Sequence, residues 1–173
     1  VGLWSAPPAM PRDREVRAGW QPSEAWLRDR NGQLLDTIRV NFAVRRLGWV
    51  PLDQVSPVVR ETIVASEDKR FFYHGGVDWS SLAGSLWAGL HGRSARGAST
   101  LSMQLAGFLA PELGGPGGRG VRDKLRQIRA AWAIEAHWSK DQILELYLNL
   151  ASFRGESQGI GAAAPALFGR APD

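Results

Sequence analysis

A succession of helical segments, most of them opened by a residue type that caps helices, most constrains the fold of this chain. Apolar residues spaced three or four apart predict six helices. In chain order they cover about 57–69, about 79–90, a segment that ends at 109, about 121–138, a segment that starts after 139, and about 157–168. The candidate capping residues are Ser56, Asp78, Ser99 or Thr100, and Ser139. We therefore expect a mainly α-helical domain.

The part of the chain before these helices predicts one β-hairpin and an arm. Within residues 26–40, Asn31-Gly32 separates two runs that contain apolar residues, and a tight primed turn there needs positive φ at both positions. Residues 1–22 are rich in Pro and Arg without a period, so we expect an arm or linker there and one domain over 23–173. Residues 111–120 hold five glycines and two prolines and predict a loop.

Composition limits the classes of function. A net charge of +4 and a pI near 10.1 favour anionic partners such as phosphates or an acidic membrane surface, although a solvated basic surface is the plainer alternative. No nucleic-acid motif accompanies the basic residues, so nucleic acid is not an expected partner. The absence of cysteine excludes disulfides and thiolate metal sites. No segment is long and apolar enough to span a bilayer, and we expect a domain of a larger protein.

Two adjacent carboxylates, Glu67 and Asp68, end the first long apolar helix, and aromatic residues, His74 and a glycine pair follow at once. A helix built for stability alone seldom ends this way, whereas proton transfer needs a partly desolvated carboxylate beside a cleft. The alternative is that Glu67 marks the edge of a buried face, with its charge paired or reaching water. No spacing supports His74 as a metal ligand, so a structural histidine is favoured.

The helix over 121–138 carries two further signals. Glu135 shares a stripe with the apolar residues Leu125, Ile128, Trp132 and Trp138. Basic residues crowd the start of the same helix, at Arg119, Arg122, Lys124, Arg126 and Arg129. Backbone N–H groups and cationic side chains at a helix N-terminus favour an anion, and the alternative is a solvated basic face.

The segment 97–104 is a turn of small residues that runs into a helix, and its glycine and hydroxyl residues let backbone approach a ligand. Taken alone, such a segment is most often only a helix N-cap. Lysine is scarce in this chain, and its three positions are Lys69, Lys124 and Lys140.

Five blocks in order over about 55–169 resemble the peptidoglycan glycosyltransferases of family 51, most of all their type 1C penicillin-binding proteins. The blocks are Glu67-Asp68…Phe71…His74…Gly76; Gly97-Ala98-Ser99-Thr100…Gln104; Lys124…Ala131…Ile134-Glu135; Lys140…Ile143-Leu144-Glu145…Tyr147-Leu148-Asn149; and Gly159-Ile160-Gly161-Ala162-Ala163…Phe168-Gly169. Each block alone is modest evidence for the family, whereas five blocks in the same order are specific to it.

The resemblance implies a lysozyme-like glycosyltransferase domain with a large helical lobe and a smaller, membrane-facing jaw. It implies that lipid II is polymerised into β-1,4-linked glycan strands with inversion and release of undecaprenyl pyrophosphate, on the periplasmic side of the bacterial inner membrane. Partners would be the membrane surface, the growing glycan strand, and a C-terminal transpeptidase domain or other cell-wall synthesis proteins. Mg²⁺ or another divalent cation is compatible with this chemistry, although the sequence requires no metal site.

The resemblance also implies roles for individual residues. Glu67 corresponds to the catalytic base and Glu135 to the second glutamate of the family. The residues expected to bind substrate are Asp68, His74, Ser99, Thr100, Gln104, Lys124, Arg126, Arg129 and Lys140.

This sequence departs from the family pattern at four positions. Gly107 stands where a basic residue is frequent, Asp123 and Gln127 stand in place of an Arg and a Glu, and Leu167 replaces a common Tyr. Two alternatives therefore stay open. One is a glycan-cleaving enzyme of similar fold, since paired carboxylates also serve glycoside hydrolysis. The other is a non-catalytic module that binds lipid II.

Overall fold

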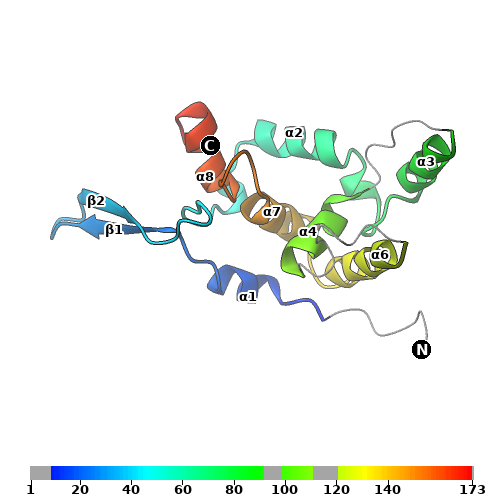
Figure 1. Cartoon of the computed structure of the whole chain (residues 1–173), viewed down its shortest axis with the longest axis horizontal. Helices are drawn as coiled ribbons and strands as arrows, with labels where there is room; N and C mark the ends of the chain where they lie inside the picture. The colour runs from blue at the N-terminus through cyan, green and yellow to red at the C-terminus, as the bar shows by residue number, and fades with distance from the viewer. Residues whose placement is uncertain (1–8, 92–98, 111–120, 173) are drawn as a thin grey trace.

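The computed structural model describes residues 9–91, 99–110 and 121–172, and it is mainly helical, as predicted (Figure 1). The helices are α1 (Asp13–Ala18), α2 (Pro57–Glu67), α3 (Trp79–Leu90), α4 (Leu101–Leu109), α6 (Val121–Glu135), α7 (Lys140–Leu150) and α8 (Ile160–Phe168). One antiparallel hairpin consists of β1 (Glu24–Arg28) and β2 (Leu34–Arg39). Short 3-10 turns cover Leu52–Gln54 and Phe71–Tyr73. The predicted loop over 111–120 lies outside the described residues.

Helix α7 runs through the centre of the molecule, with α4 and α6 beside it (Figure 1). Its start is fixed by a capping box, because Ser139 and Gln142 each accept a hydrogen bond from the other's backbone N–H. Seven consecutive residues of α7, from Ile143 to Asn149, are buried. Burial of each large apolar side chain stabilises the fold by roughly 1.5–3 kcal/mol, so α7 anchors the core.

The other helices begin and end close to their predicted bounds, with three corrections at their starts. Ser56 stands at the N-cap of α2, but its side chain accepts no capping hydrogen bond, and Pro57 in the first turn fixes the start instead. Thr100, not Ser99, caps α4 by accepting from Met103 N–H. Helix α8 starts three residues later than predicted, because Gly159 takes φ +82° and interrupts the helical backbone.

The hairpin forms where predicted, but its turn differs from the expected one. Only Gly32 has positive φ, and the connection is five residues long, from Asp29 to Gln33. The Asp29 carboxylate accepts hydrogen bonds from the N–H groups of Asn31 and Gln33, both at 2.8 Å. A side chain that replaces turn hydrogen bonds stabilises this longer loop, and a dipeptide pattern does not reveal that.

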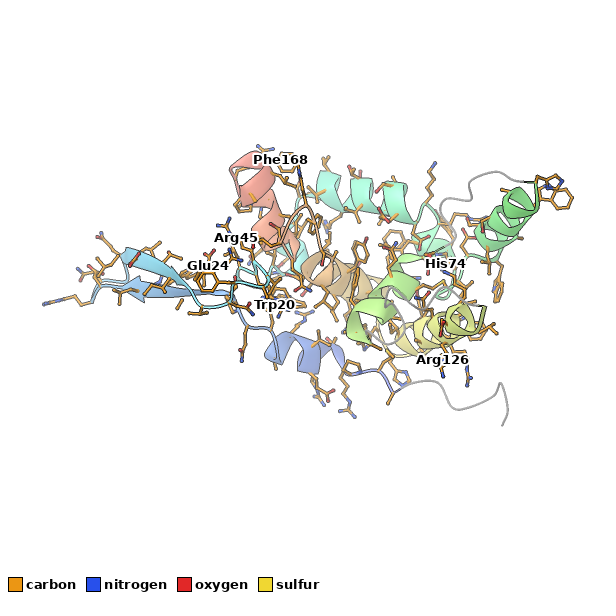
Figure 2. The ribbon with its side chains drawn as sticks, in the orientation of Figure 1. Trp20, Glu24, Arg45, His74, Arg126 and Phe168 are labelled. Carbon is orange, nitrogen blue, oxygen red and sulfur yellow. The ribbon has the colours of Figure 1, made fainter. Side chains whose placement is uncertain are left out.

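The hairpin projects from one end of the molecule, and ion pairs hold its base (Figure 2). Arg45 contacts Glu24 at 3.2 Å, beside Trp20, and Arg39 contacts Glu156 at 2.7 Å. Helix α3 lies at the opposite end (Figure 1). No helix among the described residues is long and apolar enough to cross a bilayer.

The segment predicted to be an arm contains helix α1, which packs on the core. Met10 and Val16 contact core residues, and Arg17 forms an ion pair with buried Glu145 at 2.9 Å. Glu145 also accepts hydrogen bonds from Trp49 Nε1 at 2.6 Å and from the backbone N–H of Leu52. Asp13 accepts a hydrogen bond from Gln142 Nε2 at 3.0 Å. A six-residue helix held by such contacts with residues far along the chain leaves no periodic pattern in the sequence. The boundary at residue 22 stays a prediction.

Candidate active site

Glu67 is the last residue of α2, and its side chain is exposed. The expectation of a partly desolvated carboxylate is wrong for this structure, because α2 buries none of its residues. Glu67 Oε2 accepts a hydrogen bond from Gln104 Nε2 of α4 at 3.1 Å. The carboxylate is thus oriented by one amide and otherwise open, as an acceptor of a substrate proton must be.

Gln104 is itself held by Tyr147 of α7, whose hydroxyl donates to Gln104 Oε1 at 3.3 Å. Tyr147 is buried, and its ring packs against Phe108 with centroids 5.8 Å apart. Burial, followed by the negative charge of Glu67, raises the pKa of Tyr147 to about 12. The hydroxyl therefore stays protonated at any working pH and is available as a donor.

A cavity of about 210 Å³ lies beside Gln104. It is lined by Ser99, Met103, Gln104, Gly107, Phe108 and Gln127. These lining residues carry no formal charge, so the cavity offers amide and hydroxyl groups to a ligand. Its place next to Glu67 makes it the candidate substrate site.

Lys124 of α6 supplies the positive charge at this cavity. Its Nζ donates to Ser99 Oγ at 2.9 Å, and partial burial lowers its pKa. Among the described residues, no carboxylate lies within ion-pair distance of Lys124. A half-buried cation without a carboxylate partner favours an incoming anion. Of the predicted substrate-binding residues, the structure therefore groups Ser99, Gln104 and Lys124.

Asp68 and His74 are not among the residues that line this cavity; they form a pair in which Asp68 is buried and His74 is partly buried. His74 Nε2 donates to the Asp68 carboxylate at 2.9 and 3.0 Å, and Asp68 Oδ2 also accepts from the backbone N–H of Leu101 at 3.0 Å. Their predicted contact with substrate is corrected, because Asp68 is only 6% exposed. The pair ties the end of α2 to the start of α4, which agrees with the structural alternative for His74.

Thr100 is likewise an internal residue. Its hydroxyl donates to the carbonyl of Gly76 at 2.6 Å, and its side chain is buried. A Cβ at Gly76, where φ is +88°, would stand 3.0 Å from the carbonyl oxygen of Ala131. Thr100 and Gly76 therefore bring the loop after α2 against α4 and α6, and Thr100 is corrected to a scaffold residue.

Glu135 lies in a second polar network on the inner side of α4. Its Oε1 accepts from Ser102 Oγ at 2.5 Å and from Lys140 Nζ at 2.7 Å. Lys140 also donates to the carbonyl of His74 at 2.7 Å and lies 4.5 Å from the centroid of the Phe71 ring. Lys140 is thus engaged within the protein, and its contact with substrate stays a prediction.

The two glutamates are bound by different faces of helix α4. Glu67 is bound by Gln104 and Glu135 by Ser102, and these residues, two positions apart, point about 160° apart around the helix axis. Ser102 is fully buried, whereas Gln104 lines the cavity. Helix α4 therefore separates the two carboxylates.

The remaining predicted residues lie on α6. Arg126 is half exposed, has a long 3.9 Å contact with Asp123, and lies on the other side of α6 from His74 in Figure 2. Arg129 is partly buried and is not among the residues that line the cavity. The predicted apolar stripe is also incomplete, because Leu125 is 42% and Trp132 46% exposed.

Two residues of the site were missed. Gln127 lines the cavity, and its only signal was a departure from the family pattern. Tyr147 belongs to the fourth block of the family resemblance without a role of its own, and its hydroxyl contact with Gln104 joins residues 43 positions apart, which no local pattern reveals.

The residues of the site do not form a protein cage for a resident divalent cation. Within the described part of the chain, no three His, Asp or Glu side chains lie together as a metal site. Mg²⁺ binds one or two carboxylates together with waters and substrate phosphates, and the cavity itself offers only amide and hydroxyl groups. The charge at this cavity comes from Lys124.

Comparisons with known proteins agree with these features. A family model described as Transglycosylase matches residues 31–173. Penicillin-binding protein 1C of Escherichia coli is 44% identical over 124 residues, which are 71% of this chain and 16% of that protein. A biosynthetic peptidoglycan transglycosylase of Agrobacterium fabrum is 40% identical over 135 residues, which are 78% of this chain and 57% of that protein. The chain thus spans little more than half of one relative and about a sixth of the other.

Proposed function

This chain belongs to the transglycosylase family, and from that premise we propose that it polymerises lipid II into β-1,4-linked glycan strands. The observation that carries the proposal is the juxtaposition of Glu67, held by Gln104, and Lys124, bound to Ser99, at one neutral cavity. A base and a cation that has no carboxylate partner among the described residues suit transfer of a sugar from a phosphate leaving group. The family resemblance stated from the sequence is confirmed, and with it the lysozyme-like, mainly helical fold.

Glu67 acts as the general base. The 4-hydroxyl of the acceptor sugar gives its proton to Glu67 while its oxygen attacks the anomeric carbon of the donor. The bond between that carbon and the phosphate oxygen breaks, and undecaprenyl pyrophosphate leaves with the electron pair. Direct displacement inverts the donor α-linkage to a β-1,4 bond. A positioned base contributes roughly a hundred- to ten-thousand-fold to such a step.

Lys124 stabilises the negative charge that develops on the departing pyrophosphate. Its half-buried position strengthens this interaction, because less water screens the charge than at an open surface. The amide groups of Gln104 and Gln127 add neutral donors at the same cavity. A divalent cation, when bound, would neutralise further phosphate charge, and no step above depends on it.

Glu135 and Lys140 act as positioning residues in this proposal. Their ion pair, the Ser102 hydroxyl and the His74 carbonyl join α4, α6, α7 and the loop after α2. This network fixes α4 at Ser102, and so fixes the position of Gln104 on the opposite face of the helix.

We further propose that the α3 end of the molecule meets a membrane surface on the periplasmic side of the inner membrane. Trp79 and Trp87 of α3 are 57% and 68% exposed, and Trp79 packs against exposed Trp132 with ring centroids 6.1 Å apart. Exposed tryptophans suit the boundary between lipid and water. A transpeptidase domain or other cell-wall synthesis proteins are proposed partners of the full-length protein.

The test is incubation of the full-length protein with lipid II in detergent, followed by sizing of the products. We expect polymer from the wild type and about a hundredfold less from Lys124→Met. Cleavage of purified glycan strands without polymer from lipid II would instead support a glycan-cleaving enzyme. Binding of lipid II without turnover, equal in the wild type and in Glu67→Gln, would support a non-catalytic module.

A further inference from the structure

Three side chains from three helices form a hydrogen-bonded chain that ends at the proposed base. Tyr147 of α7 donates to Gln104 Oε1 at 3.3 Å, and Gln104 Nε2 of α4 donates to Glu67 Oε2 of α2 at 3.1 Å. Exposure rises along the chain, from buried Tyr147 through half-buried Gln104 to exposed Glu67. The core of the molecule is thus connected to the reactive carboxylate by one amide.

The orientation of that amide decides what Glu67 meets. An ionised carboxylate only accepts hydrogen bonds, so Gln104 must present Nε2 to it and Oε1 to the other side. A protonated Tyr147 hydroxyl donates to Oε1 and so favours this orientation. With the amide turned over, Oε1 would face the carboxylate and favour its protonated form.

Among the described residues, the other charged groups close to Glu67 in the sequence or at the cavity are engaged elsewhere or lie in solvent. Asp68 is bound by His74 and the N–H of Leu101, and Lys69 is exposed. Lys124 of α6 donates to Ser99 across the cavity. On α4, the uncharged side chain of Gln104 donates to Glu67. On α7, Tyr147 reaches Glu67 only through Gln104.

We propose that Tyr147 is a positioning residue that acts through Gln104 to hold the Glu67 carboxylate in place as the base. Tyr147 needs no contact with substrate for this role. Gln104, expected from the sequence to bind substrate, serves the base as well. The inference rests on the proposed function, since it concerns the base of that reaction.

The experiment is the pH dependence of kcat for lipid II polymerisation by the full-length protein. We expect Tyr147→Phe to lower kcat about five- to tenfold, with KM within about twofold. Without the Tyr147 hydroxyl the amide no longer prefers the orientation that donates to a carboxylate, so the acidic limb of the profile should move to higher pH. Gln104→Met should give a similar shift, and Tyr147→Phe should add no further shift in that background.

Leu146→Val is the matched control for structural damage, because Leu146 is a fully buried residue of the same helix without a polar group. It should lower the melting temperature and leave the acidic limb in place. The inference is overturned if Tyr147→Phe behaves like this control, or if its shift adds to that of Gln104→Met. Absence of polymer from the wild type at every pH would overturn the proposed function itself, and the inference with it.

Discussion

Helices α2 and α7 have the same length, 11 residues, and opposite environments. Helix α7 buries seven consecutive residues, whereas α2 buries none and touches the core only through half-buried Val59, Ile63 and Val64. The candidate base ends the exposed helix, and the residue that braces it belongs to the buried one. In this chain, the candidate base lies on α2 and most of the packing on α7, and the side-chain amide of Gln104 connects the two helices.

The exposed helix is not loose at its catalytic end. Asp68, directly after α2, accepts hydrogen bonds from His74 and from the first turn of α4. A buried carboxylate with such partners is costly to disturb, so it fixes the backbone next to Glu67. The comparison therefore predicts that changes at the two helices separate activity from stability.

The largest effect should come from Glu67→Gln. We expect polymerisation to fall about 10²- to 10⁴-fold, while the free energy of unfolding changes by no more than about 0.5 kcal/mol, because the side chain is exposed. Product sizing and denaturant unfolding measure the two quantities. Full activity would show that Glu67 is not the base, and a large loss of stability would show that this end of α2 contributes to packing.

Leu146→Ala should do the reverse. Removing a fully buried side chain from α7 should cost about 2–5 kcal/mol of unfolding free energy. Val58→Ala, at a position of α2 that is 69% exposed, is the matched control and should cost at most about 0.5 kcal/mol. Equal losses at both positions, measured by urea unfolding, would show that α2 is packed as firmly as α7.

Glu135→Gln should have an intermediate effect. It leaves the Lys140 ammonium partly buried without its charge partner, which should cost about 1–3 kcal/mol, between the values for surface and buried pairs. A double-mutant cycle with Lys140→Met measures the coupling. If Glu135→Gln abolished polymerisation without any loss of stability, the assignment of Glu135 as a positioning residue would be wrong.

The smallest effect concerns pH. Arg70 donates to Asp78 at the start of α3, and this hydrogen bond holds the pKa of Asp78 well below its usual range. A lowered pKa in the folded state contributes stability above the ordinary value of about 4, and this contribution disappears as pH falls below it. Asp78→Asn should therefore lower the melting temperature at pH 7 more than at pH 3. An equal decrease at both pH values would count against the ion pair.

The sequence predicted the helices well because their signals are local. The capping box of Ser139 and Gln142, Asp78 before α3 and Pro57 in the first turn of α2 act within one turn of a helix. Helix α1 was missed because Glu145 binds it from far along the chain.

The candidate site was predicted only in part. Glu67 is hydrogen-bonded to Gln104, and Lys124 is hydrogen-bonded to Ser99 at the same cavity; Glu67, Gln104 and Lys124 each belong to a well-predicted helix. The sequence did not reveal which side of α4 each polar residue binds. Thr100 is predicted to bind substrate and Glu135 to be the second glutamate of the family, whereas both side chains make hydrogen bonds inside the protein. Residue type gives the available chemistry, and helix packing decides the direction in which it points.

Lys124 has a consequence for how this protein tolerates change. Within the part of the chain that the structure describes, this half-buried ammonium has no carboxylate neighbour. Its burial therefore opposes folding, and an apolar side chain of similar length would fit the same place at lower cost. Selection for thermal robustness alone would therefore discard this lysine. If this lysine is retained, the protein exchanges some stability of the folded state for the ability to bind a phosphate, whose negative charge would neutralise the buried ammonium.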